Sequence, residues 1–287
     1  TMITEDGQIK NYHIDEYNID HINPGKILFS LYEETNDKRY EKVMLTLRNQ
    51  LEWQPRTRDG GYWHKLKYTH QMWLDGLYMG APYYAQFAQN YNQPEVFDDI
   101  ANQFILMEKN ARDEKTGLLY HGWDESRIQS WSNLETGTSP EFWGRAVGWY
   151  AMALVDVLDY FPEDHPQRNE IIAIFNRLAA AVTQYQDQET GLWYQVINKG
   201  DKEGNYLEAT VSCMLSYALK KGVNNNYLDP QYNKVARKAY DGIIENLVEI
   251  EEDGEAHIHK CCAVAGLGGN PYRDGTFNYY INETIRS

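Results

Sequence analysis

Residues 116–121 read TGLLYH, and the turn that they predict recurs along the chain as DGGYWH at 59–64, as TGLWYQ at 190–195 and, more loosely, as DGEAH at 253–257. Each interval between these turns can hold about two helices of ordinary length with their connections. A glycine turn with an aromatic tip between successive helical hairpins predicts a ring or solenoid of hairpins. The tips would gather at one end of that ring, where we expect a pocket.

Apolar residues between the turns recur at helical spacing. In 165–186 they form a stripe of Ile171, Phe175, Leu178, Val182 and Tyr185. The same reasoning predicts further helices at 25–34, 38–51, 69–90, 95–111, 140–160, 207–221 and 230–249. Convincing strand patterns are few and short, and no linker interrupts the hairpins. We therefore expect one all-α domain over residues 1–287.

Two prolines make the helix predictions more specific. Ser139 and Pro140 have the residue types of an N-cap and a first helical position for the helix at 140–160. Pro82 falls inside the helix at 69–90 and should kink it or divide it in two.

Composition excludes several classes of partner. The 287 residues include 42 Asp and Glu against 27 Lys and Arg, a net charge of −15. Nucleic-acid binding needs clustered cations, so we expect no nucleic-acid partner. No apolar run approaches the roughly 18 residues that a membrane span needs. The 23 Tyr and 8 Trp combine flat apolar faces with polar tips, which suits a sugar ring.

The cysteines bear on the compartment. Cys213, Cys261 and Cys262 give an odd count without zinc-ligand spacing, so neither a disulfide framework nor a zinc site is expected. A reducing, cytoplasmic compartment fits best. A periplasmic location is the alternative if a signal peptide once preceded Thr1.

Asp75 and Asp124 are the carboxylates that we single out. On a helix, Asp75 would share a face with Met72 and Met79, where a charge is costly unless it is paired or its pKa is raised. Asp124 follows His121 and Trp123, a setting that suits an acid or base. The alternatives stay open: Asp75 can be salt-bridged in the core, and Asp124 can be a solvated turn residue.

The other candidates are weaker one by one. Arg145 and Trp149 are four apart on one helix, where they can hold a carboxylate above a stacked ring or form a structural cation–π pair. His64, His70, Trp193 and Gln195 lie in or near the turns. No metal motif, nucleotide-binding loop or nucleophile pattern is present, so we expect neither a metal nor a cofactor.

Five longer motifs carry a resemblance. They are GGYWHK at 60–65, HQMWLDGLYMGAP at 70–82, TGLLYHGWDES at 116–126, TSPEFWGRAVGWYAMALVDVLD at 138–159 and TGLWYQV at 190–196. In this order they resemble the unsaturated rhamnogalacturonyl hydrolases of glycoside hydrolase family 105, which are related to the unsaturated glucuronyl hydrolases of family 88. The resemblance runs from about residue 20 to the C-terminus.

The resemblance implies an (α/α)6 toroid with a pocket for an unsaturated uronic acid at the end of a pectin fragment. It assigns Asp124 as general acid/base and Asp75 as a supporting carboxylate. The motifs that line the family pocket contain His121, Trp123, Arg145, Trp149, Trp193 and Gln195. The family pattern usually extends past both ends of this sequence, so two alternatives stay open: this chain omits terminal helices of the toroid, or this member forms an open ring.

The implied reaction hydrates the C4=C5 vinyl ether of the terminal sugar and needs no metal or organic cofactor. One carboxylate can serve first as acid and then as base. Two alternatives stay open: an inverting glycosidase acting on saturated oligosaccharides, and a non-catalytic oligosaccharide-binding protein. The sequence does not fix the oligomeric state. In each case the partner is a small oligosaccharide.

Overall fold

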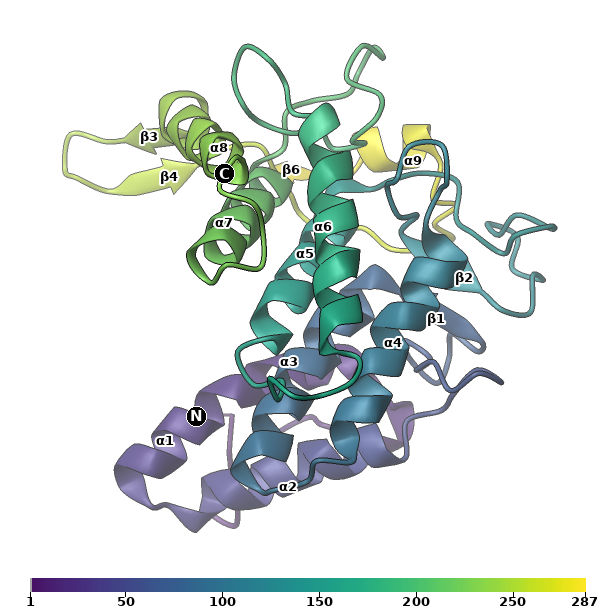
Figure 1. The fold of residues 1–287 in the computed structure, drawn as a ribbon, viewed down its shortest axis with the longest axis vertical. Helices are drawn as coiled ribbons and strands as arrows, with labels where there is room; N and C mark the ends of the chain where they lie inside the picture. The colour runs from purple at the N-terminus through teal and green to yellow at the C-terminus, as the bar shows by residue number, and fades with distance from the viewer. Residues whose placement is uncertain (1) are drawn as a thin grey trace.

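Helices dominate the computed structural model, which describes residues 2–287 (Figure 1). Four successive pairs of helices follow one another along the chain: α1 (Ile27–Thr35) with α2 (Lys38–Glu52), α3 (Leu74–Asn90) with α4 (Val96–Ala111), α5 (Gly144–Val157) with α6 (Arg168–Gln184), and α7 (Ala209–Asn224) with α8 (Tyr232–Asn246). A short helix, α9 (Phe277–Ile281), lies near the C-terminus. None of these helices is long and apolar enough to cross a membrane.

The remaining elements are short. Three 3-10 helices, η1 (Ile14–Glu16), η2 (Ile19–His21) and η3 (Asn23–Lys26), precede α1. Three antiparallel two-stranded ladders pair β1 (Gln71–Trp73) with β2 (Gly122–Asp124), β3 (Val248–Ile250) with β4 (Ala256–Ile258), and β5 (Cys261–Cys262) with β6 (Ile285–Arg286).

The long helices form two layers. Helices α3, α5 and α7 pack side by side as an inner layer, and α4 and α6 pack against each other on the outside (Figure 1). Small residues allow the inner helices to approach closely. A Cβ at Gly148 of α5 would lie 2.8 Å from the sulfur of Met214 in α7. Alternating inner and outer helices are the arrangement of a helical toroid, so the all-α prediction is confirmed.

The helix boundaries differ from expectation in three places. Residues 71–73 form β1, so α3 begins at Leu74, and Met72 does not share a helix face with Asp75. Helix α5 begins at Gly144 because the Ser139 hydroxyl accepts from the Gly122 amide instead of capping a helix. Helix α3 is continuous through Pro82, so the predicted division is wrong.

The glycine turns have the recurrent geometry that their sequences suggest. Gly60, Gly117, Gly191 and Gly254 all have positive φ, between 75° and 92°. L-residues with a Cβ rarely adopt such angles, which is why glycine stands at each position. In the second and third turns a threonine hydroxyl donates to an aspartate three residues earlier, at 2.7 Å in both. These are therefore related units.

Candidate active site

Backbone hydrogen bonds tie the start of each inner unit to the turn that follows it in the chain. The amide of Leu74 donates to the carbonyl of His121 at 3.0 Å, and the amide of Gly144 donates to that of Gln195 at 2.8 Å. In the same way, the amide of Ile19 donates to the carbonyl of His64 at 3.2 Å. The next residue after each donor is polar, so the repeat brings Asp20, Asp75 and Arg145 to one end of the bundle.

His121 and Asp75 form the most enclosed of the resulting pairs. Nε2 of His121 lies 3.1 Å from Oδ2 of Asp75. The His121 side chain is fully buried, and 15% of the Asp75 side chain is exposed. Neither atom has a well-directed hydrogen bond within residues 2–287. Burial opposes ionisation of Asp75, but His121 outweighs burial and lowers the pKa of this carboxyl. Oδ2 of Asp75 is therefore buried against His121, and only the exposed part of the side chain is open to a ligand.

A second histidine–aspartate pair stands at the equivalent position of the first unit. Nε2 of His64 lies 3.3 Å from Asp20, whose other oxygen is 2.7 Å from Nζ of Lys65. His64 and Lys65 together outweigh burial and hold the pKa of Asp20 well below its ordinary value. The charge of Asp20 also acts on Asp75 and raises its pKa, so the two carboxylates interact.

Trp73 separates the two histidines. Its ring stacks on His64 at 4.4 Å with 14° between the planes, and it meets His121 edge-on at 5.4 Å. Tyr68 stacks on its outer side at 4.8 Å, and Arg273 donates to the Tyr68 hydroxyl at 2.7 Å. The aromatic wall fixes the orientation of both imidazoles.

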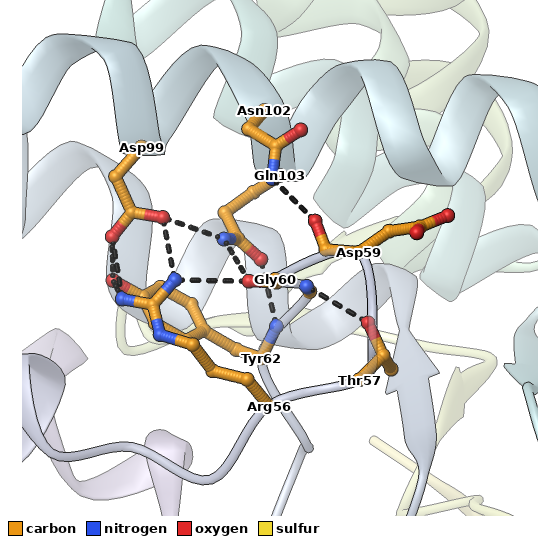
Figure 2. A network of polar contacts seen from close by, with 9 residues as sticks. Arg56, Thr57, Asp59, Gly60, Tyr62, Asp99, Asn102 and Gln103 are labelled. Atoms are coloured by element: carbon orange, nitrogen blue, oxygen red, sulfur yellow. Dashed lines mark hydrogen bonds and ion pairs between the residues drawn. The ribbon is translucent and has the colours of Figure 1, made fainter.

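The turn that carries His64 is anchored to α4 by a polar network (Figure 2). Arg56 donates to both oxygens of Asp99 at 2.7 Å, and the Tyr62 hydroxyl donates to the same carboxylate at 2.7 Å. Gln103 accepts from the Tyr62 amide and donates to the carbonyl of Gly60. Because backbone and side chains are both held, the turn presents His64 in one orientation.

Asp124 has a different environment from Asp75. Its carboxylate is fully buried and accepts from the amides of Ser126, Ile128 and Gln129 and from the hydroxyls of Ser126 and Ser132, at 2.5 to 3.4 Å. All five donors come from its own loop. These hydrogen bonds hold the loop around the carboxylate, and protonation of Asp124 would require a donor such as the Ser126 or Ser132 hydroxyl to reorient.

Two further candidates, Trp123 and His70, lie next to that loop. The Trp123 indole is nearly buried and donates to the carbonyl of Thr136 at 3.2 Å. His70 is half-exposed, lies 3.4 Å from Glu125 and packs against the Trp63 ring at 4.7 Å. The structure does not bring either side chain into contact with the His121–Asp75 pair.

Arg145 and Trp149 do not form the pair that their spacing predicts. The Arg145 guanidinium lies 4.8 Å from the Trp143 ring and donates to the carbonyl of Cys262 at 2.6 Å. Trp149 stacks on Tyr78 of α3 at 4.7 Å. Arg145 is partly exposed, so its remaining donors can serve a ligand only alongside these backbone contacts.

Trp193 and Gln195 are interior residues. Trp193 is fully buried and its indole donates to the carbonyl of Val182 at 2.8 Å. Gln195 is also buried, accepts from the Trp143 indole at 3.1 Å and donates to the carbonyl of Tyr280 at 3.0 Å. Alternate residues of this turn do not line a pocket, because its side chains pack inward against the helices.

The sequence reasoning missed three residues of this region: Asp20, Trp73 and Tyr280. The signal for Asp20 lies in the repeat, since Asp20 follows Ile19 as Asp75 follows Leu74. No comparable signal exists for Tyr280, which reaches His121 from 159 residues away. Within residues 2–287, no group of three or more His, Cys, Asp or Glu side chains is arranged to hold a metal ion.

Comparison with known proteins relates this arrangement to a carbohydrate-active family. The family model for Glycosyl Hydrolase Family 88 matches residues 1–287. A solved glycoside hydrolase from family 105 of C. acetobutylicum ATCC 824 is 50% identical, with a TM-score of 0.97 over 99% of this chain and 79% of that chain.

Two curated relatives are similar to the chain in sequence. Protein Atu3128 of Agrobacterium fabrum is 39% identical over 215 residues, which cover 73% of this chain and 91% of that protein. The unsaturated rhamnogalacturonyl hydrolase YesR of Bacillus subtilis is 26% identical over 242 residues, which cover 82% of this chain and 64% of YesR.

Proposed function

Because the chain belongs to Glycosyl Hydrolase Family 88, we propose that it removes a 4,5-unsaturated galacturonyl residue from the non-reducing end of rhamnogalacturonan fragments. The enzyme class follows from the family, which does not fit the alternative of a non-catalytic binding protein. The substrate is inferred from the similarity to YesR, an unsaturated rhamnogalacturonyl hydrolase. We also propose that residues 1–287 act as one catalytic domain.

The pair of Asp75 and His121 is the observation that carries the proposed chemistry. Hydration of a vinyl ether needs one carboxyl that gives a proton to C4 and then takes one from water. Asp75 is partly exposed, and its Oδ2 lies 3.1 Å from Nε2 of His121 without a well-directed hydrogen bond. Asp124 lacks such an oxygen, because its own loop supplies five donors. We therefore assign the proton transfer to Asp75 in place of Asp124.

In the proposed reaction, Asp75 gives up one proton and takes up one. Asp75 protonates C4 while positive charge develops at C5 and the ring oxygen. Its carboxylate then accepts a proton from the water that attacks C5, so the acid is regenerated. The resulting hemiketal opens, and the rest of the oligosaccharide leaves. Asp20, held by His64 and Lys65, stands near enough to influence the charge of Asp75 throughout.

Binding of the sugar draws on the residues around this pair. Trp73, His64 and His121 form the wall beside Asp75, and Arg145 stands at the equivalent position of the next unit. His70, Trp123 and Trp149 remain proposed contacts at the edge of the site. The interior positions of Trp193 and Gln195 suit support of the wall better than contact with the sugar.

The deciding experiment incubates the protein with a lyase-generated unsaturated rhamnogalacturonan disaccharide and follows the ultraviolet absorbance of the double bond. Loss of absorbance together with release of rhamnose supports hydration. Cleavage with the absorbance unchanged would favour the inverting glycosidase. An unsaturated glucuronyl disaccharide, run in parallel, tests the sugar preference.

Substitution of Asp75 by Asn tests the assigned residue. We expect Asp75→Asn to lower kcat by about 10²–10⁴-fold, because an amide cannot transfer the proton. Binding of the disaccharide, measured by calorimetry, should persist. Activity within a few-fold of wild type would remove Asp75 from the mechanism.

A further inference from the structure

Tyr280 connects the C-terminal helix α9 to the His121–Asp75 pair. Its hydroxyl lies 2.7 Å from Nδ1 of His121, and its side chain is fully buried. The hydrogen bonds that the structure gives this hydroxyl involve His121 alone. Each ring nitrogen of His121 thus faces one group: Nδ1 meets a phenol, and Nε2 lies 3.1 Å from Oδ2 of Asp75 without a well-directed hydrogen bond in this structure.

The Tyr280 ring has little freedom to move. It stacks on Trp143 at 5.6 Å with 11° between the planes. Its backbone carbonyl accepts from Gln195, which in turn accepts from the Trp143 indole. Three segments distant in sequence thus lock one phenol against one imidazole, and this arrangement orients the hydroxyl before any substrate arrives.

The direction of the Tyr280–His121 hydrogen bond follows from the surroundings. Burial, together with the nearby Tyr279, Asp75 and Glu141, raises the pKa of the Tyr280 phenol well above its ordinary value, so the hydroxyl keeps its proton. A phenol O–H that donates to Nδ1 requires neutral His121 to carry its hydrogen on Nε2. That hydrogen then points at the carboxylate of Asp75, whose negative charge attracts it.

The opposite tautomer is unfavourable here. With its hydrogen on Nδ1, neutral His121 would turn the lone pair of Nε2 toward Oδ2 of Asp75 at 3.1 Å. Two acceptors would then face each other in a buried site, which is costly. The other titratable side chains that act on this cluster are Asp20, His64, Glu141, Arg273 and Tyr279.

We propose that Tyr280 is a positioning residue: its hydroxyl holds His121 in the Nε2–H tautomer, and His121 in turn orients the carboxyl of Asp75 for proton transfer. The inference rests on the proposed function of Asp75, because it assigns Tyr280 a role in that same reaction. Tyr280 acts through His121 and needs no contact with the sugar.

The test compares Tyr280→Phe with Tyr150→Phe. Both residues are fully buried tyrosines, but the Tyr150 hydroxyl donates to the carbonyl of Phe104 in the core, at 3.2 Å. Each change removes one buried hydroxyl and keeps the ring. Tyr150→Phe therefore controls for the loss of stability, which thermal unfolding of both variants measures.

The first readout is independent of activity. Imidazole ¹⁵N spectra distinguish the two neutral tautomers, and the His121 signal is assigned by its loss in His121→Gln. We expect Nε2–H in the wild type and in Tyr150→Phe, and a shift toward Nδ1–H in Tyr280→Phe. An Nδ1–H signal in the wild type would overturn the proposal even if Tyr280→Phe did not fold. An unchanged signal in Tyr280→Phe would overturn it as well.

The second readout is kinetic. We expect Tyr280→Phe to lower kcat by about 10- to 100-fold, the effect of losing one buried hydrogen bond in the transition state, with little change in KM. Tyr150→Phe should keep kcat within a few-fold of wild type. Equal kcat in the two variants would contradict the proposal. If Asp75→Asn stayed active, the proposed role of Asp75 would fail instead, and the tautomer spectra would still report on Tyr280.

Discussion

Asp75 and Asp124 are both enclosed carboxylates, yet their oxygens have different partners. Asp124 is surrounded by donors from residues 126–132, whereas Asp75 faces the imidazole of His121, with His64 and the negative charge of Asp20 acting on it as well. A carboxylate whose acceptor positions are filled stabilises its loop, and one that is partly exposed, as Asp75 is, can exchange a proton with a ligand. The environment thus separates two residues of the same chemical type.

The substitution Asp124→Asn measures this difference. An asparagine NH2 group would face donors that now point at a carboxylate, so we expect stability to fall by about 1–3 kcal/mol. The kcat of the folded protein should fall far less than in Asp75→Asn. Urea unfolding measures the change in stability, and kinetics on the same sample measure the change in kcat. A loss of about 10²–10⁴-fold in kcat with stability unchanged would return the acid/base role to Asp124.

The depressed pKa of Asp75 predicts the pH dependence of turnover. His121 lowers this pKa, so the protonated acid becomes scarcer as the pH rises above it. If Asp75 donates the proton, kcat/KM should fall by up to about tenfold per pH unit through the neutral range. His121→Gln removes the group that lowers the pKa and should move this decline to higher pH. A profile that rises with pH would mean that Asp75 acts first as a base.

At the scale of elements, each inner helix is joined to the turn of the next hairpin, and the site depends on how firmly those turns are held. The first turn is attached to α4 through Asp99, which binds Arg56 and Tyr62 (Figure 2). Burial opposes ionisation of Asp99, but these partners and Gln103 lower its pKa overall. The turn that presents His64 therefore relies on one charged carboxylate.

Asp99→Asn should loosen this turn. Removing one partner of a half-buried ion pair leaves Arg56 unpaired, and we expect stability at pH 7 to fall by about 2 kcal/mol. Because the folded pKa of Asp99 is depressed, its contribution is present above the unfolded value of about 3.9 and is lost as the pH falls through the folded value. The difference in the free energy of unfolding between Asp99→Asn and the wild type should therefore become smaller at acidic pH.

Asp98→Asn is the matched control for Asp99. Asp98 precedes Asp99 in the first turn of α4, but its side chain is largely exposed and its ion-pair contact is His165 at 3.4 Å. We expect a change within about 0.5 kcal/mol in urea unfolding. Equal losses of stability in the two variants would show that the network of Figure 2 contributes no more to stability than a negative charge at the start of the helix does.

At the scale of the whole molecule, the net charge of −15 opposes the approach of an anionic uronide. Recognition must then come from short-range donors in the site, such as the partly exposed Arg145. Salt screens long-range repulsion over about 8–10 Å and affects close, buried contacts less. We expect kcat/KM to stay unchanged or rise slightly as salt increases from very low to moderate at constant pH. A steep fall would reveal an attractive basic surface that guides the substrate.

The sequence by itself determined the helices, the glycine turns and the family, because each depends on local spacing or on contiguous motifs. Apolar residues at 3.6-residue spacing predict α6 whatever packs against it, and positive φ requires glycine at 117 and 191 wherever those turns lie. The motif around Asp75 identifies the residue in the same way, but it does not reveal the partner of its carboxylate.

Only the tertiary structure decided which side chains meet. Asp20 contacts His64, which lies 44 residues later in the sequence. Tyr280, near the C-terminus, is hydrogen-bonded to His121. Asp124 and Trp193 belong to motifs that predict a pocket. The Asp124 carboxylate accepts hydrogen bonds from its own loop, and Trp193 is buried against the helices. Hydrogen bonding and burial depend on neighbours that are distant in sequence, so no local pattern could settle these roles.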